Sequence, residues 1–335
     1  MANYILIGAK GKTNSVRTAA FGDIAENDHA GIRFLYSEDT TGFAGFLRRV
    51  SVSKKLNRII KMPLRMHWEV KYRDVRKHLS DTEDNYIVFV PGVQLFQRVT
   101  PALIRNLRKK HPDCKLVFYF LDGVDRSYLV NGVNEAYLFD FLKQFDFVYT
   151  YSRQDAEKYK LRFIEIPVRH FAGSEGRPEY MLHFAGFDKN RADMLSEIKK
   201  RLDDAEISSF FQIVPTADSD RTRKDISYSA KKIYADVVQD TLKANCMLEI
   251  IAENNSSATL RYKEAVIYNK KLLTNNPEIT RLPYYDARWM RYFEKPEDID
   301  LDWVKRVENV DYGYKGDFDV FTFLDTVEKF CCEGK

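Results

Sequence analysis

The feature that most constrains this chain is an alternation of short apolar strands with helical segments, which occurs in two successive series. Strands that are joined by helical crossovers form a parallel sheet that is covered on both faces. We therefore predict an α/β fold. The expected strands of the first series are 3–10, 31–38, 85–93, 114–124, 146–152 and 161–168, and its clearest helices are 100–111, 134–145 and 153–160.

The second series begins after residues 169–178, a stretch rich in glycine and charge. A chain of 335 residues is long enough for two domains of about 150 residues each. We predict two Rossmann-like domains, residues 1–170 and 178–312, with an interdomain cleft. The C-terminal residues 313–335 contain a helix that either continues the second domain or packs back on the first. The expected elements of the second series are strands 180–187, 207–215, 246–252 and 270–276 and helices 190–205, 229–244 and 257–268.

The composition is that of a globular protein without a membrane span. Hydrophobic residues make up 44% and charged residues 30% of the chain, which excludes wholesale disorder. No apolar run approaches the roughly 18 residues of a membrane helix, and the chain enters its first strand without the basic start of a signal peptide. Its cysteines, Cys114, Cys246, Cys331 and Cys332, show no metal-ligand spacing. We expect a cytoplasmic protein.

The segment "GAKGKT" at residues 8–13 has the look of a phosphate-binding loop but fails its pattern. A loop of the form G-x-x-x-x-G-K-[ST] needs a glycine at position 6, where this chain has Leu6. What remains is a strand-end loop with Lys10 and Asn14 near its tip. Because ligands bind beyond the carboxyl ends of the strands in such sheets, this loop either faces the cleft or is a solvated turn.

No sequence pattern indicates a metal site. The chain has no His-Glu-x-x-His or Cys-x-x-Cys signal, and its six histidines are scattered as ordinary surface or packing residues. These observations count against a metal-dependent hydrolase, and we also expect no transferase that holds a metal through an Asp-x-Asp motif. We therefore expect no bound metal and no cofactor.

The segment "SSATLRYKEAVIYNKKLLTNN" at residues 256–276 carries the clearest functional signal. If Ser256 or Ser257 caps a helix, Thr259 falls in its first turn, where free N–H groups and the helix dipole favour an anion such as a diphosphate. Arg261 and Glu264 share a helix face, so that Arg261 can bind a phosphate and Glu264 can accept hydrogen bonds from a ribose. The alternative is an ordinary capped helix with one ion pair.

This segment resembles the donor-binding region of the bacterial GT-B glycosyltransferases that build capsular and lipopolysaccharide sugars. In that family a strand ending in an acidic residue precedes an "LTLR-x-x-EA" helix and a "KKLIT-N-N" strand; here Thr259 to Ala265 and Lys270 to Asn276 match. Residues 184–202 and 145–168 are similar to further parts of the two domains. Residues 256–276 contain no pair of glutamates at the E-x7-E spacing of many retaining members, which leaves an inverting or a retaining reaction open.

The resemblance implies roles for individual residues. Glu249 takes the place of the acidic strand-end residue, and Lys189 and Arg191 are placed to meet the donor diphosphate. Such cations and a helix N-terminus replace a metal in stabilising the departing nucleotide. An inverting enzyme also needs a base from the first domain, for which Asp122 and then Asp125 are the candidates. The alternative for the segment "DGVD" is a turn stabilised by its aspartates.

A basic segment within residues 46–77 mixes cations with apolar side chains. This composition suits an amphipathic surface on anionic lipid, where each cation contributes about 1 kcal/mol. The alternatives are a solvated basic face and, less well supported, a nucleic-acid surface, because no RNA-binding module is visible. The cations expected to contact the membrane or the acceptor are Arg48, Arg49, Lys54, Lys55 and Arg58.

Together these features predict a glycosyltransferase of the hexosyltransferase type that moves a sugar from a nucleotide-sugar, with UDP as the expected nucleotide. The acceptor is a surface glycan or a lipid-diphosphate-linked glycan, reached from the cytoplasm at the inner face of the cell membrane. We expect no metal and no nucleic-acid partner. Two other functions stay open: a nucleotide-sugar epimerase of the GT-B type, and a non-catalytic partner subunit that binds a nucleotide-sugar or docks on a membrane.

Overall fold

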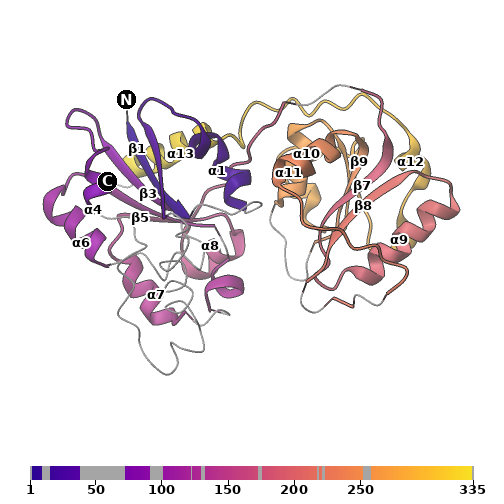
Figure 1. The fold of residues 1–335 in the computed structure, drawn as a ribbon, viewed down its shortest axis with the longest axis horizontal. Helices are drawn as coiled ribbons and strands as arrows, with labels where there is room; N and C mark the ends of the chain where they lie inside the picture. Colours follow the sequence, from indigo (N-terminus) through magenta and orange to yellow (C-terminus); the bar gives the residue numbers. More distant parts are fainter. Residues whose placement is uncertain are drawn as a thin grey trace. The chain divides into compact units, whose positions relative to one another are not determined.

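The computed structural model divides into two compact units, Met1–Arg169 with Phe318–Lys335, and His170–Asp317. Each unit is built on its own parallel sheet (Figure 1). The two parallel sheets confirm the α/β fold that the sequence predicts. The structure describes residues 2–9, 16–37, 72–90, 101–121, 123–129, 133–172, 176–216, 219–220, 223–251 and 258–333.

The sheet of the first unit has six strands in the order β2-β1-β3-β4-β5-β6, and all neighbours run parallel. Successive side chains of a strand point to opposite faces. Leu6 and Val88 therefore enter one hydrophobic core, and Ile5 and Ile87 enter the other. The strands are β1 (Asn3–Ala9), β2 (Ile32–Ser37), β3 (Asn85–Val90), β4 (Lys115–Phe120), β5 (Phe147–Thr150) and β6 (Arg162–Phe163).

Helices cover both faces of this sheet. The apolar residues of α1 and of the C-terminal helix α13 pack into the first core, whereas those of α6 and α7 pack into the second. The bounds are α1 (Val16–Glu26), α4 (Tyr72–Arg76), α6 (Pro101–Lys110), the π-helical segment η2 (Val124–Leu129), α7 (Glu135–Leu142), α8 (Arg153–Tyr159) and α13 (Val320–Glu333).

The C-terminal helix belongs to the first unit. The Tyr4 hydroxyl on β1 donates a 2.6 Å hydrogen bond to Oε2 of Glu328. Phe323 lies against the rings of Phe21 and Tyr119, with centroids 5.5 and 4.9 Å apart. The sequence left two positions open for this helix, and these contacts place it on the face that α1 also covers.

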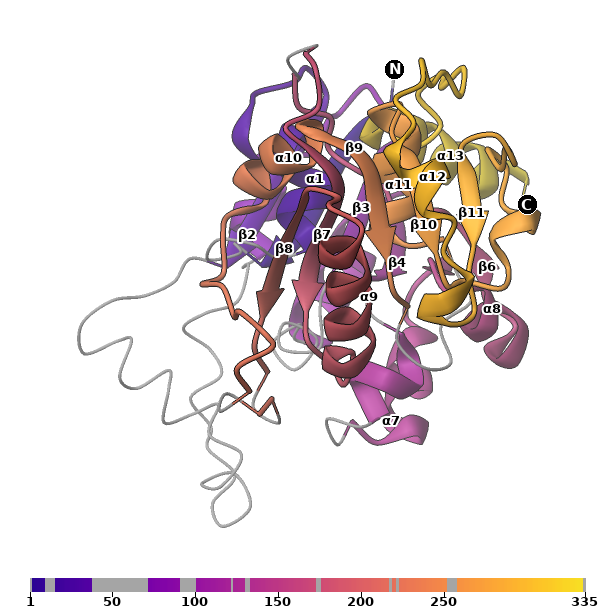
Figure 2. The same cartoon turned by 90° about the vertical axis from the view of Figure 1, so that its right-hand side faces the viewer.

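The second unit has a five-stranded parallel sheet in the order β11-β10-β9-β7-β8. Helix α9 crosses one face of this sheet, as Figure 2 shows, and packs there with α12. The strands are β7 (Tyr180–Phe187), β8 (Ser209–Val214), β9 (Ala244–Glu249), β10 (Lys271–Thr274) and β11 (Met290–Tyr292). The helices are α9 (Ala192–Asp204), α10 (Tyr234–Leu242), α11 (Leu260–Ile267), η3 (Ile279–Arg281), η4 (Pro296–Asp298) and α12 (Leu301–Lys305).

The opposite face of the second sheet carries buried polar side chains among apolar ones. Leu182 and Phe184 of β7 point into the core under α9, so the intervening His183 points to the other face. Glu249 and Thr274 are register partners at the ends of β9 and β10, and both are buried. This face carries α10 and α11, and it holds the candidate site.

Several expected elements differ from the structure in their bounds. The strand expected at 161–168 is a strand only over Arg162–Phe163, and the Ile164 N–H makes the last hydrogen bond of this segment to β5, at the carbonyl of Thr150. The helix expected at 229–244 begins at Tyr234, since Ser229 is still hydrogen-bonded to the carbonyl of Ile213 on β8. The sequence pattern did not predict β11 or α12, which are short and lack a long apolar period.

Candidate functional site

Helix α11 begins with a side-chain cap from Thr259. The Thr259 Oγ1 atom accepts hydrogen bonds from the backbone N–H groups of Arg261, at 3.1 Å, and Tyr262, at 3.3 Å. Such a cap satisfies N–H groups that have no partner inside the helix. The helix therefore starts at Leu260, later than the sequence predicts. Both expected caps, Ser256 and Ser257, lie outside the described residues.

The Glu249 carboxylate holds the capping residue Thr259 in place. Glu249 ends β9, its exposed fraction is 2%, and its carboxylate accepts hydrogen bonds from the hydroxyls of Thr259 and Thr274. Burial raises the pKa of Glu249, while the two hydroxyls and the charge of Arg261 lower it. The Thr259 hydroxyl thus donates to the carboxylate and accepts from the helix, which ties the start of α11 to β9 and β10.

Glu264 lies one turn into the same helix and is completely buried. Its Oε1 atom accepts a 2.8 Å hydrogen bond from the Tyr234 hydroxyl, and its Oε2 atom forms an ion pair with Arg261. Burial raises the pKa of Glu264, Arg261 and Tyr234 lower it, and the charge of Glu249 raises it. The Glu249 carboxylate is therefore close enough to disfavour the ionisation of Glu264.

Arg191 joins the ends of two strands. Its guanidinium donates to the carbonyl oxygens of Phe187, Asp188 (3.1 Å from Nε) and Ile250. Burial lowers the pKa of Arg191, the charge of Asp188 raises it, and the charge of Arg261 lowers it. The structure thus directs the Arg191 donors to backbone carbonyls, while its role toward a diphosphate stays a prediction.

Lys189 is exposed in the turn after β7, at a left-handed φ of 44°. Its Nζ atom lies 6.0 Å from the centroid of the Phe187 ring, and Nζ of Lys231 lies 5.7 Å from the same centroid. The Phe187 side chain is 38% exposed at the carboxyl end of β7. Two ammonium groups therefore lie beside an exposed aromatic ring at the edge where ligands of such sheets bind.

Asp125 lies in η2 of the first unit and has two donors. Lys158 Nζ lies 2.7 Å from Oδ2, and the Tyr159 hydroxyl lies 2.6 Å from Oδ1. The hydrogen bonds from Lys158 and Tyr159 lower the pKa of Asp125. A carboxylate held ionised by a lysine is a weak proton acceptor, so a base at Asp125 would need Lys158 to move. Its role as a base stays a prediction.

The remaining predicted site residues lie outside the described residues. They are Lys10, Asn14, Arg48, Arg49, Lys54, Lys55, Arg58, Asp122 and Ser257.

Among the residues that the structure does describe, no group of three or more His, Cys, Asp or Glu is arranged to hold a metal ion. No helix within these ranges is long and apolar enough to cross a membrane.

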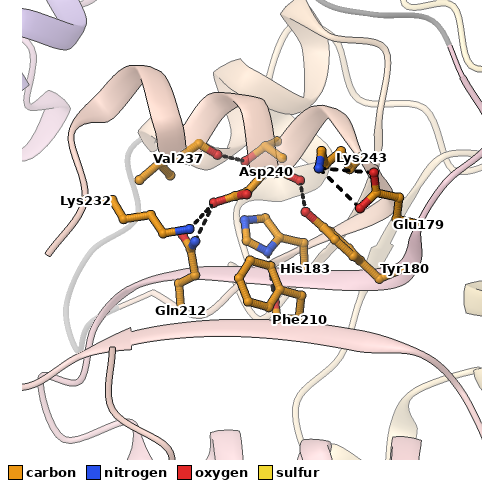
Figure 3. A network of polar contacts seen from close by, with 10 residues as sticks. Glu179, Tyr180, His183, Phe210, Gln212, Lys232, Val237, Asp240 and Lys243 are labelled. Atoms are coloured by element: carbon orange, nitrogen blue, oxygen red, sulfur yellow. Dashed lines mark hydrogen bonds and ion pairs between the residues drawn. The ribbon is translucent and has the colours of Figure 1, made fainter. Parts of the chain in front are cut away.

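Sequence reasoning missed the polar network next to this site (Figure 3). His183 Nδ1 lies 2.9 Å from the carbonyl oxygen of Phe210, and burial lowers the pKa of His183 to about 4. The Asp240 carboxylate accepts from Gln212 and, at 2.7 Å, from Lys232. A single histidine in an apolar strand gives no sequence signal that would distinguish it from a packing residue.

The sequence also did not predict the roles of Tyr234 and of the two lysines in the "KKLLTNN" segment. Tyr234 lies 30 residues before Glu264, so no local spacing links them. Lys270 Nζ donates to the carbonyl of Leu242 at the end of α10, and Lys271 Nζ donates to the carbonyl of Arg306. In both hydrogen bonds the Nζ atom lies 2.7 Å from the carbonyl oxygen. These lysines hold neighbouring helices and loops in place.

Comparison with known proteins identifies the fold. No protein-family model matches the chain, and no curated protein matches its sequence. An α-glucosyltransferase solved with UDP-glucose and DNA containing an abasic site matches with a TM-score of 0.51 at 14% identity, over 99% of this chain and 94% of that one. A UDP-forming α,α-trehalose-phosphate synthase from Burkholderia xenovorans matches with a TM-score of 0.51 at 9% identity, over 99% of both chains. The chain therefore has the fold of the GT-B glycosyltransferases.

Proposed function

We propose that this protein is a glycosyltransferase whose second unit binds a nucleoside-diphosphate sugar at the start of α11. The observation that carries the proposal is the arrangement of Arg261 and Glu264 on the turn that Thr259 and Glu249 fix at the carboxyl ends of β9 and β10. In open parallel sheets, ligands bind beyond these strand ends. The GT-B fold makes a nucleotide-sugar the ligand class that fits this position best.

Each charged group of the arrangement has a part in binding the donor. The positive end of the α11 dipole and the Arg261 guanidinium attract the diphosphate. Glu264 accepts hydrogen bonds from the ribose hydroxyls. The exposed Lys189 adds positive charge at the end of β7. UDP is the nucleotide we propose, because UDP-glucose and a UDP-forming reaction occur among the proteins with this fold.

The proposed reaction is glycosyl transfer without a bound metal. The bond between the anomeric carbon and the diphosphate oxygen breaks, and the acceptor hydroxyl oxygen bonds to the same carbon. Cations and the α11 N-terminus stabilise the negative charge that develops on the leaving nucleotide. The acceptor proton passes to a base, for which Asp125 of the first unit and Asp122 stay the candidates in an inverting reaction.

For the acceptor we propose a growing surface glycan of the capsular or lipopolysaccharide type, carried on a lipid diphosphate. The support is the family resemblance of residues 256–276 together with the basic, partly apolar segment 46–77, whose composition suits an anionic membrane surface. That segment lies almost wholly outside the described residues.

Donor turnover by the purified protein tests the proposed function. Each of several UDP-sugars is incubated with the protein and EDTA, and UDP release is measured with water as the only acceptor. We expect slow release of UDP from one donor, and a loss of this release in Glu264→Gln. The control Glu278→Gln, which removes an exposed i,i+3 ion pair of the same unit, should keep the activity. Failure of every nucleotide-sugar to bind or react would contradict the proposal.

A further inference from the structure

The two groups that the proposed function assigns to the donor bind each other. The Arg261 guanidinium forms its ion pair with Oε2 of Glu264, three residues later on α11. The other oxygen, Oε1, accepts from the Tyr234 hydroxyl at 2.8 Å. Both oxygens of the carboxylate therefore have a partner before any ribose arrives.

The two partners of Glu264 differ in their freedom to leave. Tyr234 is buried, and its hydroxyl lies in the interior between α10 and α11. The Arg261 side chain keeps an exposed fraction of 19%, whereas that of Glu264 is 0%. Arg261 is thus the partner that reaches toward solvent, and Oε2 is the oxygen that it covers.

We propose that Arg261 makes the site selective for nucleotides over nucleosides by covering Oε2 of Glu264 until a phosphate group draws its guanidinium away. This inference rests on the proposed function, because it takes Oε2 as an acceptor for the ribose. It adds a second role to Arg261: the residue binds phosphate and also withholds the ribose acceptor from ligands that carry none.

Charge compensation explains why a phosphate can open the site and a nucleoside cannot. A phosphate offers the guanidinium the same bidentate geometry as a carboxylate, so Arg261 keeps an anionic partner when it moves. The ribose hydroxyls then donate to the vacated oxygen. A nucleoside gives Arg261 no new partner, and breaking a buried ion pair without replacement is strongly unfavourable.

Titrations of uridine and UDP against wild type and Arg261→Gln test this inference. We expect UDP to bind the variant about tenfold or more weakly, and uridine to bind it about tenfold or more tightly than wild type. Arg281→Gln is the matched control, because Arg281 forms an exposed i,i+3 pair with Glu278 in the same unit and should leave both affinities unchanged. Arg261→Lys keeps the positive charge but not the bidentate guanidinium, so it should lose less affinity for UDP than Arg261→Gln does.

A second measurement uses the wild-type protein alone. If phosphate draws Arg261 from Glu264, inorganic phosphate should raise the affinity for uridine, and this coupling typically amounts to about 5- to 150-fold. If phosphate leaves the uridine affinity unchanged or lowers it, the selective role of Arg261 is overturned while the proposed function stands. The same holds if Arg261→Gln loses affinity for UDP without gaining affinity for uridine. Absence of UDP binding to wild type would overturn both.

Discussion

The Tyr234 hydroxyl donates a 2.8 Å hydrogen bond to Oε1 of Glu264, and both side chains are buried. Tyr234 is the first residue of α10, and Glu264 lies in the middle of α11, so this bond joins the two helices that cover the face of the second sheet opposite α9. It also fixes which way the carboxylate faces. The position of Glu264 therefore depends on a residue that is distant in sequence.

Removing this hydroxyl should weaken both the fold and the proposed donor site. In Tyr234→Phe a buried carboxylate loses a donor, which typically costs about 1 to 3 kcal/mol. The pKa of Glu264 should rise further, because the Tyr234 hydrogen bond lowers it. Urea unfolding measures the stability loss, and UDP titrations across acidic and neutral pH should show binding that fails at a higher pH than in wild type. Tyr292→Phe, at a residue 46% exposed, is the control and should change neither quantity.

The cap of α11 gives a prediction for the free energy of unfolding. Thr259→Ala removes the acceptor for two helix N–H groups and one of the two donors to buried Glu249. We expect a loss of about 1 to 3 kcal/mol in chemical denaturation. Thr259→Ser keeps the hydroxyl and should stay within about 0.5 kcal/mol of wild type. Equal stability of the alanine and serine variants would show that the hydroxyl has no such role.

His183 should make the second unit less stable in acid. Its folded pKa of about 4 lies below the ordinary value of 6.5, so the unfolded chain takes up a proton first as the pH falls. The stability from neutral His183 is complete above pH 6.5 and is lost toward pH 4; at pH 5 the loss is about 2 kcal/mol.

The measurement for His183 is the urea midpoint at pH 7 and pH 5. His183→Gln keeps a side-chain donor for the carbonyl of Phe210 but cannot titrate, so its stability should fall less between the two pH values than that of wild type. His78→Gln, at a half-buried histidine of the first unit, serves as the control. If wild type and His183→Gln lose the same stability between pH 7 and pH 5, protonation of His183 is not the cause of the loss.

The fold could be predicted from the sequence because buried strands and helical crossovers have different periods. The helix and strands around Glu249 and Glu264 followed from the same periodicity, and parallel strands that end at one edge bring Thr274 and Glu249 together. The exact start of α11 could not be predicted, because several consecutive residues before it are good caps. Which of them caps the helix depends on Glu249, whose carboxylate binds Thr259.

Other features depended on contacts that no local pattern encodes. Arg191 has the charge expected of a diphosphate ligand, but the structure directs its donors to the carbonyls of Phe187, Asp188 and Ile250. Tyr234 gains its role only when α10 packs beside α11. Sequence spacing identifies residues on one helix face, whereas pairing across elements requires the three-dimensional structure.

The most direct test of the nucleotide site is thermal unfolding of wild type and Glu264→Gln with UDP, GDP, dTDP and CMP. A ligand at about 100 times its dissociation constant stabilises the folded state by about 2.7 kcal/mol, which is a shift of several degrees. We expect UDP to raise the melting temperature of wild type and of the control Glu278→Gln, but not that of Glu264→Gln. If none of the nucleotides shifts the wild type, or if Glu264→Gln responds as wild type does, then α11 is only a capped helix with an ion pair.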